Sequence, residues 1–211
     1  MYNDITGIIL SGGKSSRMGT NKAFLKLGNK YIIEILADLL KSIFSKVILV
    51  TNEPELYGFL KIDMFEDIYK SKGPLGGIHS GLVNSKTETN FIISCDIPFI
   101  TKPLIEFIIN YPSDKKIKVP FADGFVQQLC GVYSRSKLPE IEDQLSYNDS
   151  LSSITKCKVL KLVEEAPGEI INIVKEMPEY EANTFLNMND NAEFIQAKYK
   201  YKRERIIENN Y

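Results

Sequence analysis

The chain has 211 residues, of which 44% are hydrophobic and 25% are charged, and its net charge is −1. This composition predicts an ordinary soluble globular protein and excludes a strongly basic nucleic-acid binder, although a local basic pocket for phosphates stays open. Three scattered cysteines and one histidine form no CxxC pair, so neither a zinc site nor a disulfide framework is expected. No apolar run reaches the roughly 18 residues of a membrane helix, and no signal peptide is recognised, so we expect a cytoplasmic protein.

The first half of the chain alternates short apolar runs with amphipathic segments. Continuous apolar strands are typical of a sheet that is covered on both faces, and their alternation with helices indicates right-handed βαβ units. We therefore expect an α/β fold, with a mostly parallel central sheet and helices on both faces. The predicted strands are Ile5–Leu10, Lys46–Thr51 and Asn90–Cys95, and the predicted helices are Tyr31–Phe44, Pro74–Val83 and Lys102–Asn110, the last capped by Thr101.

The second half of the chain is less regular. No linker divides it from the first half, so we expect a single domain over residues 1–200, followed by a charged tail at 198–211. The predicted strands here are Val126–Ser134 and Lys158–Val163, and the predicted helices are Leu138–Leu145, Leu151–Lys156 and a last one that begins near Asp190.

A glycine-rich, basic stretch follows the first predicted strand and reads LSGGKSSRMGTNK from Leu10 to Lys22. It would lie at the carboxyl edge of the sheet, where ligands bind in open α/β folds. Gly12 and Gly13 allow a tight turn and close approach of a ligand, and consecutive backbone N–H groups in such a turn attract anions. With Lys14, Arg17 and Lys22 nearby, the stretch predicts a triphosphate-binding loop; a simple turn with solvated basic residues is the alternative.

Two better-known phosphate-binding motifs do not fit this stretch. A Walker A loop requires a glycine where Ile8 stands, five residues before Gly13. The dinucleotide fingerprint G-x-G-x-x-G is also absent. The loop is therefore not that of a P-loop or a dinucleotide-binding enzyme.

A single carboxylate ends another apolar run, in the segment Phe91–Pro98. Mg²⁺ prefers oxygen ligands and is often held by only one or two carboxylates together with substrate phosphates and water. Asp96, placed at a strand end and followed by the rigid Pro98, suits such a sparse site. A turn or helix-capping role for Asp96 is the alternative from the sequence alone.

Together these segments resemble a known family. The stretch from Leu10 to Lys22 is similar to the L-x-G-G-x-S-x-R-M-G-x-x-K signature of nucleotidyltransferases with a Rossmann-like, GT-A type fold, and it most resembles the molybdenum cofactor guanylyltransferases. The resemblance spans roughly residues 5–197 and implies a three-layer sandwich with a nucleotide-binding half (1–110) and an acceptor-binding half (111–197). The further matching segments are Asp67, Gly73–Ile78, Cys95–Phe99, Gln128–Tyr133 and Phe185–Asn189.

The resemblance implies a role for each matching residue. The run Leu10–Gly13 would contact base and ribose, and its double glycine is similar to that of the guanine-using members. Arg17 would meet the phosphates, Lys22 would contact the α-phosphate, and Asp96 would bind Mg²⁺, which makes these three the catalytic residues. Asp67, Asn52 and Gly76 would bind or enclose the nucleotide, and Asn187 and Asn189 would face the acceptor.

The activity that the resemblance implies is transfer of GMP from GTP to the terminal phosphate of molybdopterin, with release of pyrophosphate. Transient contacts with pterin-loading proteins and molybdoenzymes would follow, and neither nucleic acid nor a membrane is an expected partner. A relative that uses CTP or another acceptor and a non-catalytic pterin-binding adaptor remain alternatives. Two departures keep them open: Asn21 stands where the family usually has an acid, and arginine is absent around Asp149–Ser153, where Lys156 or Lys158 would have to substitute.

Overall fold

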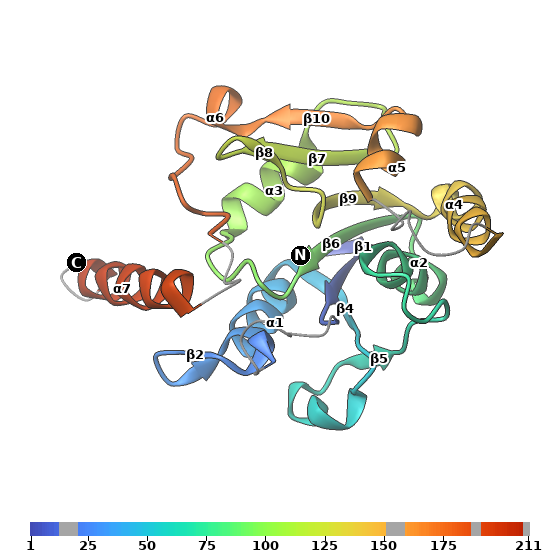
Figure 1. Cartoon of the computed structure of the whole chain (residues 1–211). Helices are drawn as coiled ribbons and strands as arrows, with labels where there is room; N and C mark the ends of the chain where they lie inside the picture. Colours follow the sequence, from blue (N-terminus) through green and yellow to red (C-terminus); the bar gives the residue numbers. More distant parts are fainter. Residues whose placement is uncertain (13–20, 151–158, 187–190, 209–211) are drawn as a thin grey trace.

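A mixed central sheet of eight strands organises the chain (Figure 1). The structure is a computed structural model and describes residues 1–12, 21–150, 159–186 and 191–208. The strand order is β10-β7-β9-β6-β1-β4-β5, with β8 paired to β7. β1 pairs in parallel with β4 and β6, β4 with β5, and β10 with β7, whereas β9 runs antiparallel to β6 and β7. The strands are β1 (Tyr2–Leu10), β4 (Phe44–Val50), β5 (Asp63–Phe65), β6 (Thr89–Ser94), β7 (Ile117–Ala122), β8 (Phe125–Val126), β9 (Cys130–Ser134) and β10 (Glu169–Asn172).

Helices cover both faces of this sheet, so the predicted α/β sandwich is confirmed. Buried side chains of α1 and α3 pack on one face, and those of α2, α4 and α5 pack on the other. A small hairpin of β2 (Lys26–Leu27) and β3 (Lys30–Tyr31) precedes α1. The helices are α1 (Ile32–Ile43), α2 (Pro74–Asn84), α3 (Lys102–Asn110), α4 (Leu138–Ser150), α5 (Val159–Glu165), α6 (Ile173–Glu176) and α7 (Asn191–Glu208).

Strand β1 shows why the sheet is buried on both sides. Ile5 and Ile9 point into the apolar layer under α1, whereas Ile8 and Leu10 point into the layer under α2. All four are buried, and each such side chain stabilises the fold by roughly 1.5–3 kcal/mol relative to exposure. Because successive side chains point into opposite apolar layers, this strand is encoded by consecutive apolar residues and not by alternating apolar and polar residues.

The structure confirms β1, β4, β6 and helices α1 to α3 close to their predicted bounds. The predicted cap of α3 is present, because the Leu104 N–H donates to Thr101 Oγ1 over 3.4 Å. Residues Val126–Ser134 form two strands instead of one, since a turn in which the Cys130 N–H donates to the Gln127 carbonyl separates β8 from β9. The predicted helix Leu151–Lys156 lies outside the described residues.

The predicted strand Lys158–Val163 is wrong, because Val159–Glu165 forms helix α5. Val159, Leu162 and Val163 are buried together against the α2 side of the sheet. Their spacing of three and four residues is that of one helical face, which a short apolar run does not distinguish from a strand. Strand β10, which the sequence analysis did not predict, forms the edge of the sheet beside β7.

The last helix, α7, runs from Asn191 through residue 198, where the sequence predicted a charged tail to begin. Its Tyr201 ring packs on the turn at Gly28, where an added Cβ would lie 2.8 Å from Tyr201 Cε1. Gly28 also has a φ of +62°, so this turn suits glycine on two counts. Within the described part of the chain, no helix is both long and apolar enough to cross a membrane.

The close approach of β9 to β7 gives a first testable prediction. A Cβ added at Gly131 would lie 2.3 Å from the Lys118 carbonyl oxygen, so Gly131→Ala forces the two strands apart. We expect it to lower the free energy of unfolding, measured by urea titration, by about 1–3 kcal/mol. Gly58→Ala is the matched control, because no described atom lies within 4 Å of its added Cβ. Equal stability of the two variants would contradict this packing.

Candidate functional site

Four segments meet at the carboxyl edge of the parallel strands. They follow β1 (Ser11–Gly12), β4 (Thr51–Asn52), β5 (Glu66–Asp67) and β6 (Cys95–Asp96). Because parallel neighbours end at the same edge, residues far apart in sequence arrive side by side. Backbone hydrogen bonds continue the pairing into these segments: Ser11 N to Val50 O at 2.9 Å, Thr51 N to Phe65 O at 2.9 Å, and Cys95 N to Leu10 O at 3.0 Å.

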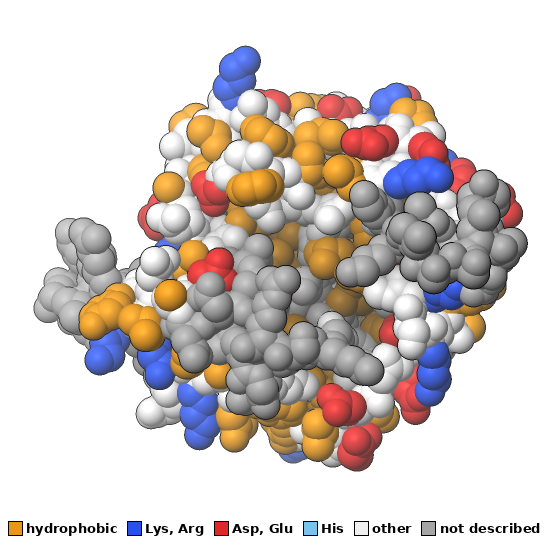
Figure 2. All heavy atoms as spheres, viewed as in Figure 1, with side chains coloured by type: hydrophobic (Ala, Val, Ile, Leu, Met, Phe, Trp, Pro, Cys, Tyr) orange, Lys and Arg blue, Asp and Glu red, His pale blue; other side chains and the backbone are white. Residues whose placement is uncertain are grey.

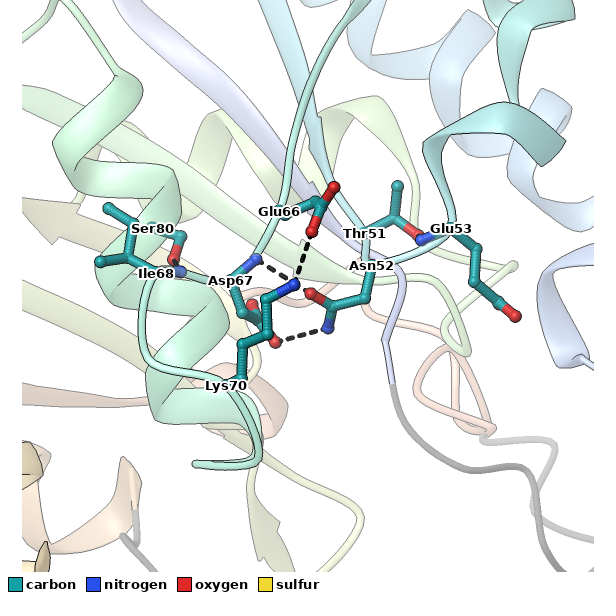
Figure 3. Close-up of polar contacts among 8 residues, drawn as sticks. All are labelled: Thr51, Asn52, Glu53, Glu66, Asp67, Ile68, Lys70 and Ser80. Carbon is teal, nitrogen blue, oxygen red and sulfur yellow. Dashed lines mark hydrogen bonds and ion pairs between the residues drawn. The ribbon is translucent and has the colours of Figure 1, made fainter.

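Asn52 and Asp67 form a reciprocal pair at this edge (Figure 3). The Asn52 amide donates to Asp67 Oδ2 over 2.8 Å, and the Asp67 backbone N–H donates to Asn52 Oδ1 over 3.1 Å. The two bonds fix the carboxylate relative to its own backbone. Both residues were predicted to bind the nucleotide, and the structure brings them together.

The loop that follows Asp67 is held against α2. The Ile68 N–H donates to Ser80 Oγ over 2.8 Å, and Lys70 pairs with Glu66 over 2.7 Å (Figure 3). A Cβ added at Gly76 would lie 2.8 Å from the Tyr69 carbonyl oxygen, so Gly76 allows the loop to lie flat on the helix. Gly76 therefore has a packing role in the structure, besides the nucleotide contact predicted for it.

Gly77, which the sequence analysis did not single out, borders the same space as two predicted nucleotide-binding residues. A Cβ added there would lie 3.5 Å from Leu10 Cδ2 and 3.7 Å from Asp67 Oδ1. The side chain of Leu10 and one oxygen of Asp67 thus converge on a position that carries no side chain. Gly12, by contrast, has no described atom within 4 Å of an added Cβ, so open space lies beside it.

Lys22 and Asp96 both lie near Cys95. Lys22 lies in the short 3₁₀ turn η1 (Lys22–Phe24), and Asp96 follows Cys95 directly; both are half-buried. Burial, together with the adjacent Asp96 carboxylate, raises the pKa of the Cys95 thiol to about 12. A hydrogen bond from Ser11 and the positive charge of Lys22 oppose that rise in pKa. Lys22 is therefore close enough to the Asp96 loop for its charge to act there.

Four predicted site residues lie outside the described part of the chain. Gly13 and Arg17 belong to residues 13–20, and Asn187 and Asn189 to residues 187–190. Their roles stay predictions.

Gln128 is a polar residue that the sequence analysis quoted in a matching segment without giving it a role. Its carboxamide Oε1 is buried and has no hydrogen-bond partner among the described residues. The Ser94 N–H donates to the Leu129 carbonyl over 2.8 Å, so the β6–β9 register places Gln128 opposite Cys95, one residue from Asp96. Buried polar atoms without partners are rare, and they often mark a site that a ligand completes.

The donor set at this edge fits a sparsely held hard cation. Asp96 supplies one carboxylate, and the described residues contain no group of three His, Cys, Asp or Glu side chains placed to hold a metal. Such a set does not suit zinc, but it suits Mg²⁺ that is also bound by substrate phosphates. Figure 2 shows acidic and basic side chains interspersed around this face, without a single large basic surface among the described residues.

Comparison with known proteins gives the family. The model of the MobA-like NTP transferase domain matches residues 7–164. The chain belongs to this family. A protein of Clostridium perfringens (strain 13), named "Probable molybdenum cofactor guanylyltransferase", is 37% identical over 188 residues, which cover 88% of this chain and 92% of that protein.

Crystal structures of two proteins have the same fold as this MobA-like chain. A protein from Aquifex aeolicus VF5 superposes with a TM-score of 0.72 at 26% identity, covering 88% of this chain and 93% of that one. The molybdopterin-guanine dinucleotide biosynthesis protein A from Archaeoglobus fulgidus superposes with a TM-score of 0.75 at 19% identity, covering 94% and 99%. The recognised family and the predicted fold are therefore both confirmed.

The raised pKa of Cys95 gives a prediction for this site. A thiol whose pKa moves from 9.0 to about 12 holds roughly 1000-fold less thiolate near pH 8, and the thiolate is the form that is alkylated. We expect iodoacetamide to modify Cys95 in the native MobA-like protein at least 100-fold more slowly than in the urea-unfolded chain, as followed by peptide mass spectrometry. Similar rates in the two states would contradict the burial of Cys95 beside Ser11.

Proposed function

We propose that this chain transfers GMP from GTP to the terminal phosphate of molybdopterin, which yields molybdopterin guanine dinucleotide and pyrophosphate. The observation that carries the proposal is that three charged side chains lie at one sheet edge. Asp67 is a carboxylate suited to a base, Lys22 is a cation suited to phosphates, and Asp96 is a carboxylate suited to the Mg²⁺ that accompanies phosphates. The relative from Clostridium perfringens supports the choice of substrates by its name and by its coverage of 88% of this chain.

The base would bind between Leu10 and Asp67. Asp67 Oδ2 already accepts from Asn52, whereas Oδ1 lies beside the space next to Gly77. A carboxylate oxygen there would accept from the N1–H and the exocyclic amino group of guanine. Cytosine offers a different set of donors at its pairing edge, so this arrangement favours GTP over the alternative nucleotide, CTP.

The phosphates would lie between Lys22 and Asp96. Asp96 would hold Mg²⁺, which when bound neutralises charge on the α-phosphate. Lys22 would stabilise the negative charge that builds on the same group, and Arg17 is proposed to contact the phosphates beside it. The acceptor phosphate attacks in line as pyrophosphate leaves, so the protein contributes positioning and charge neutralisation without a covalent intermediate.

The acceptor would bind on the β9 side of Asp96. The buried Gln128 Oε1 needs a donor, and the ring N–H and amino groups of a pterin are donors. Asn187 and Asn189 are proposed to face the acceptor phosphate. Transient contacts with pterin-loading proteins and molybdoenzymes, and a cytoplasmic location, belong to the same proposal. A non-catalytic adaptor that only binds the pterin is the alternative of a different class, and it would release no pyrophosphate.

Removal of the Asp96 carboxylate tests the phosphate side. Asp96→Ala is expected to lower the rate of pyrophosphate release from GTP and molybdopterin by at least 100-fold, because the cation loses its protein ligand. Asp63→Ala, which removes an exposed carboxylate that pairs only with Lys46 among the described residues, is the control and should retain full activity. Unchanged turnover in Asp96→Ala would contradict the proposed role of Asp96 in binding the metal ion.

Guanine recognition is tested by comparing two nucleotides. Asp67→Ala should weaken GTP binding by roughly 10- to 100-fold, the usual effect of losing hydrogen bonds to a charged group. Inosine triphosphate lacks the exocyclic amino group, so the same variant should weaken its binding less. Calorimetric titrations with Mg²⁺ present would measure both affinities. Equal losses for the two nucleotides, or a wild-type preference for CTP, would contradict the proposed base site.

The acceptor side yields a prediction in which stability and activity move in opposite directions. Gln128→Leu removes a buried hydrogen-bond acceptor atom that has no described partner. Thermal stability should therefore stay equal or rise, since an unsatisfied polar atom costs about 1–3 kcal/mol. The KM for molybdopterin should rise at least 10-fold while GTP affinity is unchanged. A loss of stability with normal kinetics would mean that Gln128 serves the fold alone.

A further inference from the structure

Side-chain hydrogen bonds connect the Lys22 turn, through a buried tyrosine, with the end of β1 beside the Asp96 loop. Asn21 Nδ2 donates to the Tyr57 hydroxyl over 3.0 Å, and the Tyr57 hydroxyl is 2.8 Å from Ser11 Oγ. Ser11 directly follows Leu10, whose carbonyl accepts from the Cys95 N–H over 3.0 Å. Tyr57 has no exposed surface and Ser11 is 4% exposed, so water does not compete for these bonds.

The direction of the bond between Asn21 and Tyr57 follows from the groups involved. Asn21 Oδ1 accepts from the Ala23 N–H over 3.1 Å, which fixes the amide so that Nδ2 faces Tyr57. A phenol has two lone pairs and one proton. With Asn21 donating to one lone pair, the Tyr57 hydroxyl keeps its proton and a second lone pair, so either hydroxyl can donate in its bond with Ser11 Oγ.

This series of bonds leads from the residue before Lys22 to the end of β1, which pairs with the residue before Asp96. Asn21 caps the 3₁₀ turn that carries Lys22, and Cys95 immediately precedes Asp96. Tyr57 comes from a third segment, the residue between η2 (Pro54–Leu56) and η3 (Gly58–Leu60). Its ring packs against Phe24 of the Lys22 turn, with ring centroids 4.9 Å apart. Tyr57 therefore contacts the Lys22 turn through both its ring and its hydroxyl.

We propose that Tyr57 is a positioning residue, whose hydroxyl fixes the Lys22 turn relative to the segment that carries Asp96. Lys22 acts on charge that develops only in the transition state, so its placement governs turnover more than nucleotide binding. The proposal rests on the proposed function for Lys22 and Asp96, and it adds a residue outside the resemblance to the known family.

The same geometry explains why an amide suits position 21. Asn21 Nδ2 also lies 3.4 Å from Glu53 Oε2, so it serves two oxygen acceptors. An aspartate there would have no proton for Tyr57 and would face the Glu53 carboxylate. Glu53 thus supplies a negative charge next to the Lys22 turn, which the family usually obtains from an acid at position 21.

Tyr57→Phe is the direct test, because it keeps the ring against Phe24 and removes only the hydroxyl. We expect kcat for pyrophosphate release to fall roughly 10- to 100-fold, as a small misplacement of a catalytic group does, with KM for GTP changed less than 3-fold. Tyr31→Phe is the matched control, since its ring also contacts Phe24, with centroids 5.6 Å apart. A Tyr57→Phe enzyme with the kcat of the wild type overturns the proposal.

A double-mutant cycle separates positioning from general loss of stability. Asn21→Ala removes the neighbouring bond in the same series, so the double variant Asn21→Ala/Tyr57→Phe should lose little more kcat than either single variant. Effects on kcat that multiply would show that the two residues act independently and would overturn the proposal.

Amide hydrogen exchange gives a readout that needs neither acceptor nor turnover. The Ala23 N–H is held by Asn21, so Tyr57→Phe should speed its exchange at least 10-fold while leaving the Ile105 N–H in α3 unchanged. Unchanged exchange at Ala23 would overturn the proposal even if the wild-type protein uses an acceptor substrate other than molybdopterin. Faster exchange at Ala23 in Tyr57→Phe, together with a wild-type protein that releases no pyrophosphate from GTP and molybdopterin, would instead contradict the proposed function and leave the positioning role of Tyr57 intact.

Discussion

The parallel pairing of β1 with β4 and β6 is the constraint on which the site depends. Because these strands end at one edge, the segments that follow them deliver Ser11, Asn52 and Asp96 to the same place, although as many as 85 positions separate them in the sequence. The apolar layers on both faces of β1 hold the strands in register, and a slip by one residue would turn Leu10 away from Gly77. Packing in the middle of the sheet thus determines chemistry at its edge.

The polar contacts at this edge divide into an exposed and a buried group. The Asn52–Asp67 pair is solvent-accessible, so it contributes little to stability in the free protein, and it would gain strength if the proposed base excluded water from it. The Asn21–Tyr57–Ser11 series is largely buried and satisfied, which makes it rigid before any ligand binds. An exposed side that is proposed for the base and a buried side that is proposed for the phosphates would suit an enzyme whose main contribution is positioning.

The parts of the fold that the sequence predicted are those with strong, unambiguous patterns. The helical stripe of Tyr31–Phe44 has one clear period, and the apolar run at Ile5–Leu10 is ended by a glycine-rich turn, whereas the short run before Glu165 fits a strand and a helix equally and was assigned wrongly. Asp67 was found through the family resemblance, but its bond to Asn52 required coordinates. Tyr57 had no signal in the sequence, and Gln128 stood in a matching segment without a role, because the burial that makes each of them notable is visible only in the coordinates.

A crystal structure of the protein with Mg²⁺ and a GTP analogue that cannot be cleaved at the α-phosphate is the most direct test of the account. We predict guanine between Leu10 and Asp67, the α-phosphate within reach of the Lys22 ammonium, and the cation on the Asp96 carboxylate. A nucleotide bound away from the carboxyl edge of β1 and β6, or a cation that leaves Asp96 unligated, would contradict it.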